Sequence, residues 1–222
     1  MSSRSAYISA WLVLAATFVG SLIAYPYLPA VMATHWGIDG QVNGTMNAFA
    51  GAFLLPFIMF AVLLILTAIP YIDPMRSNIE SFRRQYNGLI AVLMLVLATV
   101  QTAVLSVNLG ALFNVTSVIL PAVGIMIFYL GIILPQTKRN WFIGIRTPWT
   151  ISSDEVWDKT HELGGRLFQI LGVVIVLSVF APVSYQVWII VAPLVVIVVG
   201  LFLYSYALYQ KLPHKKMHNK TV

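Results

Sequence analysis

The stretch Lys138–Arg166, KRNWFIGIRTPWTISSDEVWDKTHELGGR, is the longest polar break in an otherwise apolar chain. It holds five of the thirteen Lys and Arg residues, four of the seven Asp and Glu residues, and three of the six Trp residues. On both sides of it lie uncharged runs of about twenty residues, each long enough to cross about 30 Å of hydrocarbon. The stretch therefore predicts an integral membrane protein in which this segment lies on one side of the bilayer.

The composition favours a membrane protein over a soluble one. Of the 222 residues, 59% are hydrophobic and only 9% are charged, whereas a soluble domain is about 25% charged. The chain has no cysteine, which excludes disulfides and thiol chemistry. The formal net charge is +6, and its location fits membrane topology and anionic lipid better than a nucleic-acid partner.

Six apolar segments are predicted to be transmembrane helices, so the expected fold is an all-α bundle. A signal peptide is the competing interpretation of the first segment, but Pro26 and Pro29 stand where small residues would form a cleavage site. The segment 29–45 is rich in turn signals and is expected to be a loop. The six predicted spans cover residues 6–28, 46–69, 88–112, 118–135, 167–183 and 187–209.

The spans suggest a division of the chain into two halves and a tail. An N-terminal half, residues 1–87, has two spans, and a second half, residues 88–210, has four. The second half includes the polar loop 136–166. Residues 211–222 form a basic tail.

Two short helices are predicted outside the spans. Residues at three-to-four spacing in the second loop indicate an interfacial helix with arginines near headgroups: Ile79, Phe82, Arg83 and Tyr86. In the polar stretch, Ser152 and Glu155 match a capping box. They predict a short amphipathic helix from about 153 to 163, which Gly164-Gly165 is expected to end or bend.

The basic residues predict the orientation. Six spans leave both termini on one side of the membrane, and all thirteen Lys and Arg residues fall on that side. The first, third and fifth loops have none. Because cytoplasmic loops carry the excess of Lys and Arg, the termini and the polar stretch are predicted to be cytoplasmic. The loop that contains His35 is predicted to be external, in a multi-pass protein of the cell membrane.

The sequence has no recognised catalytic or cofactor motif. No ionisable residue lies inside a predicted span, which argues against a proton-coupled pump or an ion channel. A phosphate-binding glycine loop, HExxH and Gly-x-Ser-x-Gly are all absent, so no cofactor is expected. Polar residues within the spans could line a polar path, but hydrogen bonding between helices is the interpretation we favour: Gln101, Asn108, Tyr129 and Gln169.

The loop 29–45 offers one candidate metal site. His35 and Asp39 lie four residues apart and could meet a metal, but zinc sites use three or four protein ligands. We therefore favour a compact loop in which His35 is hydrogen-bonded and Trp36 lies at the lipid interface, and we expect no metal.

The polar stretch leaves two interpretations of its arginine open. Arg146 could clamp a phosphate or a lipid headgroup, or it could pair with Asp154 or Glu155. The tryptophans of the stretch could be interface anchors, and those are Trp141, Trp149 and Trp157.

Two stretches resemble a known family. The pattern Asn140-x-x-x-Gly-Ile-Arg-Thr-Pro-Trp-Thr150, followed by Val156-Trp157 and Thr160-His161, is similar to the signature of the SdpI family. The segment after Pro29, with the turn His35-Trp-Gly-Ile-Asp-Gly40, resembles the DUF1648-like domain often fused to that family. Asn43 stands where members often carry an acidic residue.

The resemblance implies a polytopic membrane protein, not an enzyme, that protects its cell from a secreted membrane-active peptide toxin. As in the namesake system, it would also capture a cytoplasmic repressor protein. The implied cytoplasmic binding residues are Asn140, Gly144, Arg146, Thr147, Pro148, Trp149, Trp157 and His161. The implied external binding residues are His35, Trp36, Gly37, Asp39 and Gly40.

Two other functions stay open from the residues. One is a small transporter or a lipid-interacting protein. The six spans could form a weak inverted repeat of three spans each, in which the loops after the first and fourth spans occupy equivalent positions. A membrane enzyme using His35 or His161 lacks a positioned partner base or nucleophile.

Overall fold

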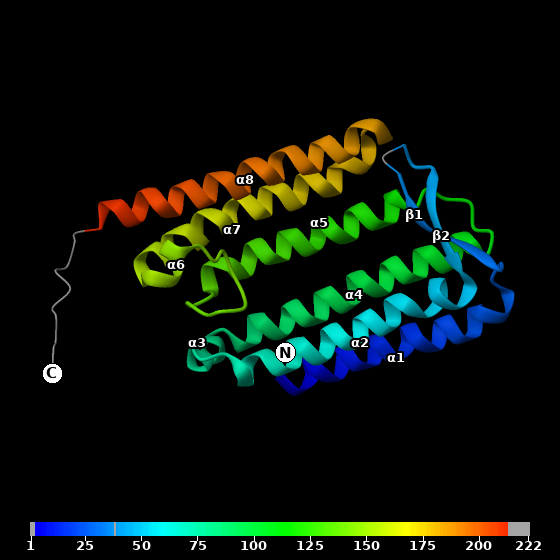
Figure 1. Ribbon diagram of the computed structural model, residues 1–222, viewed down its shortest axis with the longest axis horizontal. Helices are drawn as coiled ribbons and strands as arrows, with labels where there is room; N and C mark the ends of the chain where they lie inside the picture. The colour runs from blue at the N-terminus through cyan, green and yellow to red at the C-terminus, as the bar shows by residue number, and fades with distance from the viewer. Residues whose placement is uncertain (1–2, 38, 213–222) are drawn as a thin grey trace.

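The computed structural model describes residues 3–37 and 39–212, and within these ranges six helices are long and apolar enough to cross a membrane. They lie side by side (Figure 1). The prediction of six spans is thereby confirmed, and the predicted tail lies outside the described residues from 213 onwards. The long helices are α1 (Ser3–Ala24), α2 (Ala48–Ile72), α4 (Arg83–Asn108), α5 (Thr116–Ile133), α7 (Asp154–Leu177) and α8 (Val183–Lys211).

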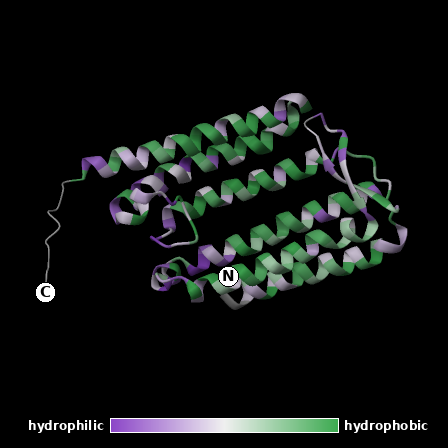
Figure 2. Cartoon of the chain, viewed as in Figure 1, coloured by the Kyte–Doolittle hydropathy of each residue, from purple (hydrophilic) through white to green (hydrophobic). Residues whose placement is uncertain are grey.

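Shorter elements connect the long helices at the two ends of the bundle. One end holds the β-hairpin of β1 and β2, and the other holds α3, α6 and the loop between α5 and α7 (Figure 1). We call these the hairpin end and the basic end. Figure 2 shows apolar residues along the helices and polar residues at both ends, in the hairpin and in the segments of the basic end. The short elements are η1 (Tyr25–Tyr27), β1 (Val31–Trp36), β2 (Val42–Asn47), α3 (Arg76–Ser81), η2 (Leu134–Gln136), α6 (Pro148–Ser152) and η3 (Ser178–Phe180).

The long helices form two groups of three. Helices α1, α2 and α4 enclose a buried apolar cluster that includes Leu14, Met59, Tyr86 and Met94. Helices α5, α7 and α8 make the second group, which meets the first mainly along α4 and α5 (Figure 1). The proposed boundary between residues 87 and 88 falls inside α4.

Helices α5 and α7 approach closely because glycines face each other across their interface. A Cβ added to Gly131 would lie 2.6 Å from the carbonyl oxygen of Gly165, and one added to Gly124 would lie 2.7 Å from that of Gly172. On each helix the two glycines are seven residues apart, which is about two helical turns, so both contacts lie on the same face. Small residues permit such backbone contact, which is the usual basis of helix association in a membrane.

The segment 29–45, predicted as a loop, is instead a β-hairpin. Strands β1 and β2 pair antiparallel from Val31 opposite Asn47 to Trp36 opposite Val42. The side chain of Asn108 on α4 accepts a bond from the Ala33 N–H at 2.8 Å and donates to the Ala33 carbonyl at 2.9 Å. The amide side chain of Asn108 thus takes the place of a neighbouring strand beside β1. The hydrophobic periodicity of residues 29–45 cannot reveal a partner that lies on a distant helix.

Helix α7 corrects two predictions about the polar stretch. It runs unbroken from Asp154 to Leu177, so the helix expected to stop near 163 is the first part of a membrane span. The N-cap is Ser153 and not Ser152, and its hydroxyl accepts the Val156 N–H. Residues 148–152 form the separate helix α6.

The pair Gly164-Gly165 does not end α7, because both glycines make room for neighbours. A Cβ on Gly164 would lie 2.4 Å from Ile145, and one on Gly165 would lie 2.6 Å from Pro135. The predicted interfacial helix is also divided differently. It is split between α3, which ends at Ser81, and α4, which begins at Arg83 and so starts the third span five residues earlier than expected.

Candidate functional site

The loop 137–147 at the basic end, which we call the motif loop, is shaped by Asn140. This side chain is fully buried. Its oxygen accepts the N–H groups of Phe142 and Ile143 at 2.9 and 2.6 Å. Its nitrogen donates to the carbonyls of Lys138 and Ile143, both at 2.8 Å. Because one amide satisfies four backbone groups, Asn140 determines the turn and is not free to bind a ligand.

Gly144 and His161 connect the motif loop to α7. The Nε2 atom of His161 accepts the Ile145 N–H at 2.8 Å, and Nδ1 lies 2.7 Å from the Trp157 carbonyl. These partners fit the neutral ring with its proton on Nδ1. Gly144 has φ +122°, and a Cβ there would lie 2.4 Å from His161 Nε2. Only glycine fits this position.

Trp157 fills the space beneath the loop. It is fully buried, and its ring stacks on His161 with 4.0 Å between the ring centres. Its indole N–H donates to the Thr137 carbonyl at 3.1 Å. Trp157 therefore supports the loop from below and is not an anchor at the lipid surface, which had been one interpretation of this residue.

Thr147 and Pro148 begin α6 and fasten it to α8. The Thr147 hydroxyl accepts the Thr150 N–H at 3.2 Å, while the Thr150 hydroxyl accepts the Thr147 N–H at 2.8 Å, which closes a capping box. The Thr147 hydroxyl also lies 3.0 Å from the hydroxyl of Ser205 on α8. The ring of Trp149 packs edge-on against Phe202 with 4.9 Å between centres.

Two residues of the connection between α2 and α4 also hold the motif loop, and neither was among the residues predicted from the sequence. Asp73 is buried, and its carboxylate accepts the N–H groups of Trp141 at 3.0 Å and Met75 at 2.6 Å. The Asn78 side chain donates to the Arg139 carbonyl at 2.7 Å. The only signal in the sequence is an acidic residue directly after a span, which does not reveal a partner 68 residues away.

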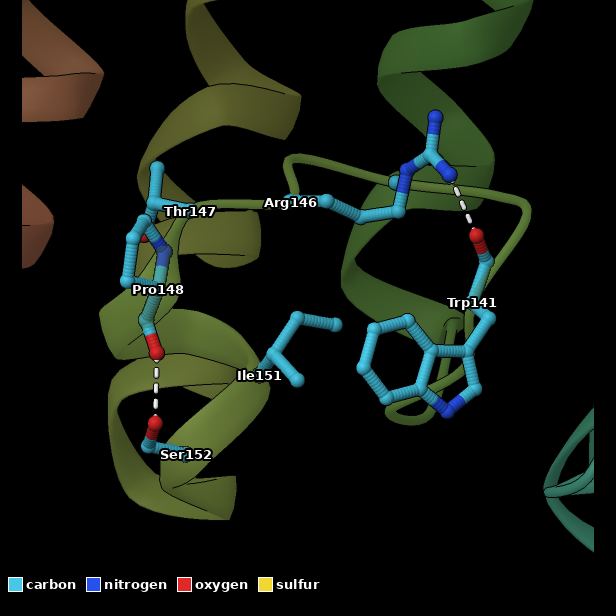
Figure 3. A pocket seen from close by; sticks show the side chains of 7 residues that line it. Trp141, Arg146, Thr147, Pro148, Ile151 and Ser152 are labelled. Atoms are coloured by element: carbon cyan, nitrogen blue, oxygen red, sulfur yellow. Dashed lines mark hydrogen bonds between the residues drawn. The ribbon is translucent and has the colours of Figure 1, made fainter.

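The side chain of Arg146 is exposed on the surface of the motif loop. Its guanidinium donates to the Trp141 carbonyl (Figure 3). The pairing with Asp154 or Glu155, one of the two open interpretations, is not found, because those carboxylates lie 3.0 Å from Arg139 and 2.7 Å from Lys159.

Beside Arg146 lies an open depression of about 770 Å³. Figure 3 shows Arg146 and Trp141 on one side of it and Pro148, Ile151 and Ser152 on the other. The depression is lined by Trp141, Gly144, Arg146, Thr147, Pro148, Ile151 and Ser152.

This arrangement is suited to binding and not to proton transfer. Both ring nitrogens of His161 and all four hydrogen-bonding positions of Asn140 are occupied by backbone groups. Within the described residues no three His, Asp or Glu side chains are grouped closely enough to hold a metal ion. The cation of Arg146 remains accessible, beside a lining of mixed character with Trp141, Pro148 and Ile151 among its apolar residues.

The external candidate residues lie together at the hairpin end, far from the motif loop (Figure 1). His35 Nδ1 lies 2.5 Å from the Asn43 side-chain oxygen, while the Asp39 carboxylate accepts the Gln41 N–H at 3.1 Å. His35 is thus hydrogen-bonded, as favoured, and its partner is Asn43, not Asp39. Gly40 has φ +77° and makes the turn between the strands.

A second cavity, of about 580 Å³, lies beneath the hairpin. The strand register is irregular here, so that Thr34 and Asn43 oppose no residue, and both of them line the cavity. The other lining residues are mostly apolar and come from the hairpin, α4, α5 and α8: His35, Trp36, Gly37, Val100, Val104, Val115, Thr116, Ile119 and Val187.

The polar residues that the sequence placed within the spans form hydrogen bonds to neighbouring helices or strands. The Gln101 side chain is buried and donates to the Ser21 hydroxyl at 3.2 Å and the Ala52 carbonyl at 2.8 Å. Tyr129 donates to the Gln85 carbonyl at 3.3 Å, and Gln169 to the Gly131 carbonyl at 3.2 Å. These contacts support the packing interpretation over a polar path.

Comparison with known proteins identifies the two motif regions. Residues 136–206 match the SdpI/YfhL protein family, and residues 12–60 match the domain of unknown function DUF1648. The chain is 26% identical to the Immunity protein SdpI of Bacillus subtilis (strain 168) over 88% of its length and 92% of that protein. It is 35% identical to the Uncharacterized membrane protein YbgB of the same organism over 22% of its length and 54% of that protein. No solved structure matches.

These matches agree with the six apolar helices and with the positions of both motifs. The chain is therefore a multi-pass protein of the cell membrane that is similar to the SdpI/YfhL family over residues 136–206 and to DUF1648 over residues 12–60.

Proposed function

We propose that this protein is an immunity protein that protects its own cell from a secreted membrane-active peptide toxin. The similarity to the Immunity protein SdpI extends over nearly the whole of both chains and includes both structured ends. A relative that shared only an apolar helix pattern would not be expected to match at the motif loop as well.

The observation that carries the proposal is how the motif residues are used. Asn140, Gly144, Trp157 and His161 shape the loop, and the side chains that stay exposed on it include Trp141, Phe142 and Arg146. A rigid surface with an exposed cation and apolar neighbours supports recognition of another molecule. It does not support catalysis, so we infer that the protein is not an enzyme.

The two ends would then have different tasks. With the basic end cytoplasmic, as the Lys and Arg distribution predicts, the hairpin end is the side that a secreted toxin reaches. Its cavity combines an apolar lining with His35 and Asn43 at the hairpin, which suits an amphipathic peptide. The motif loop would be the face that recruits a cytoplasmic repressor.

A small transporter is the weaker alternative. Gln101 and Asn108 are the polar residues that a path through the first helix group would need, and both are bonded to neighbouring backbone. Transport would require these bonds to be exchanged for substrate contacts during each cycle.

The test is survival of a toxin-sensitive bacterial host that expresses the protein. Cells with the wild-type chain should survive a dose of membrane-active peptide toxin that kills cells with empty vector. Gly144→Val should remove protection, because it breaks the loop, whereas Gly200→Val should not, because a side chain at Gly200 meets nothing within 4 Å. Membrane levels of each variant are measured by immunoblot. Wild-type cells that die like the vector control at normal protein levels would count against the immunity role.

A further inference from the structure

Among residues 3–37 and 39–212, no acidic partner is found for Arg146, although many carboxylates lie at the basic end. Six of the seven acidic residues lie at this end, and the seventh, Asp39, lies in the hairpin. Asp73 is buried and accepts two backbone N–H groups. The other five carboxylates each lie within 2.7–3.3 Å of a basic residue, in the pairs Glu80–Arg83, Asp154–Arg139, Glu155–Lys159, Asp158–Lys138 and Glu162–Arg166.

The guanidinium therefore keeps most of its binding capacity. A guanidinium has five N–H donors, and across residues 3–37 and 39–212 the hydrogen bond found for Arg146 is the one to the Trp141 carbonyl. A neutral carbonyl does not balance the positive charge. An anion that satisfies the remaining donors must come from outside the described chain.

The loop holds Arg146 in place before any ligand arrives. The residue on its N-terminal side is fixed by the bond from the Ile145 N–H to His161, and the residue on its C-terminal side is the Thr147 cap of α6. Trp141 is fixed by the bond from its N–H to Asp73. A ligand thus meets a cation on a preformed backbone and does not have to order a flexible loop, which lowers the entropic cost of binding.

The position of the depression indicates which anion it meets. Residues 137–153 connect the candidate span that ends at Gln136 to the one that begins at Asp154, and from this connection we infer that the motif loop lies near the lipid headgroups. Trp141 is 48% exposed and Phe142 is 37% exposed, and both are suited to the membrane interface. The exposed Arg76 and Arg84 at the same end add positive charge without an acidic partner among the described residues.

We propose that the depression at Arg146 binds the phosphate of an anionic phospholipid. The guanidinium donates two parallel N–H bonds to two phosphate oxygens, and the lipid's apolar portion lies along Trp141, Pro148 and Ile151. A soluble phosphate offers the same anion without the apolar part. The site does not depend on the immunity role, because it rests on charge and shape alone.

The experiment uses the full chain in lipid nanodiscs and in detergent. Retention of phosphatidylglycerol is measured by native mass spectrometry and compared with phosphatidylcholine and with inorganic phosphate. Wild type should retain phosphatidylglycerol, and Arg146→Gln should weaken its apparent affinity by about tenfold or more, the effect expected for loss of a charge-assisted hydrogen bond. Arg84→Gln is the matched control, because it removes an exposed, unpaired arginine at the same end but outside the depression, and it should change the affinity less than about twofold.

Each other result would overturn the proposal. Equal losses in both variants would mean that the general positive field attracts lipid. Equal retention of both lipids by wild type would mean that the net negative charge of the lipid is not recognised, because phosphatidylcholine carries a phosphate that its choline cation balances. Binding of inorganic phosphate that depends on Arg146, without any retention of phosphatidylglycerol, would assign the site to a soluble anion. Circular dichroism and thermal unfolding in phosphatidylcholine discs should be unchanged in Arg146→Gln, which shows that the comparison is made between folded proteins.

Discussion

Replacing Gly144 with alanine tests the central contact of the motif loop. At φ +122° a residue with a Cβ is strained, at a cost of about 1–3 kcal/mol. The new methyl group would also lie 2.4 Å from His161 Nε2 and 3.0 Å from the Trp157 ring. Moving His161 away breaks its bond with the Ile145 N–H and leaves buried polar groups without partners, at about 1–3 kcal/mol more. The expected loss of unfolding free energy is about 2–6 kcal/mol.

The assay is unfolding in mixed micelles by titration with an anionic detergent, followed by far-ultraviolet circular dichroism. Gly200→Ala is the control, because a Cβ at that helical position meets nothing within 4 Å, and it should be neutral or stabilise the helix by up to about 1 kcal/mol. Introducing Gly144→Ala into a His161→Ala background removes the collision with His161 but keeps the backbone strain and the contact with Trp157. The alanine should then cost only about 1–3 kcal/mol.

Two results would refute this reasoning. A loss below about 0.5 kcal/mol in the wild-type background would mean that the loop tolerates a side chain at Gly144, as an ordinary surface position does. An equal loss with and without His161 would mean that the two residues are not in contact, since contacting residues show a measurable coupling energy.

Three further predictions concern the cap, the helix interface and the orientation. Thr147→Val should lower the unfolding free energy by about 1–2 kcal/mol, because it removes the cap of α6 and the bond to α8; in Thr102→Val, which loses only a bond to its own helix, the same titration should show less than half that change. Gly131→Val should prevent formation of a stable, monodisperse protein in size-exclusion chromatography, because its Cβ would lie 2.6 Å from the backbone of α7; a normal elution profile would contradict the close approach of α5 and α7. Because the chain has no cysteine, single variants report its orientation directly: Thr45→Cys in the hairpin should react with a membrane-impermeant maleimide on intact cells, and Ser152→Cys in α6 should react only after permeabilisation. The opposite labelling pattern would reverse the predicted topology.

The sequence by itself was sufficient for the number of membrane spans and for the location of the motif, but not for the first residues of the third and fifth spans. Span number follows from the length of uncharged apolar runs, and this is a property of the chain that does not depend on what packs against it. The resemblance of the segment around Gly144 and His161 to a family signature likewise depends only on residue order, and the family match agrees with it.

The sequence was less informative wherever a residue's role depends on a distant partner. The pair Gly164-Gly165 has the composition of a helix end, yet it lies in mid-helix because Ile145 and Pro135 occupy the space where side chains would be. Whether a glycine ends a helix or admits a neighbour is decided by packing, which local propensity does not contain.

The same limit applied to the site itself. Residue types alone left Arg146 with two interpretations, and the structure contradicted the pairing with Asp154 or Glu155 because other cations occupy those carboxylates. Asp73 was not selected, although it holds Trp141 from another connection. The length of an apolar segment and its charge determine how that segment interacts with lipid and water, so their effects can be predicted along the chain. Hydrogen bonds and steric contacts act over a few ångströms between segments that only the folded chain brings together.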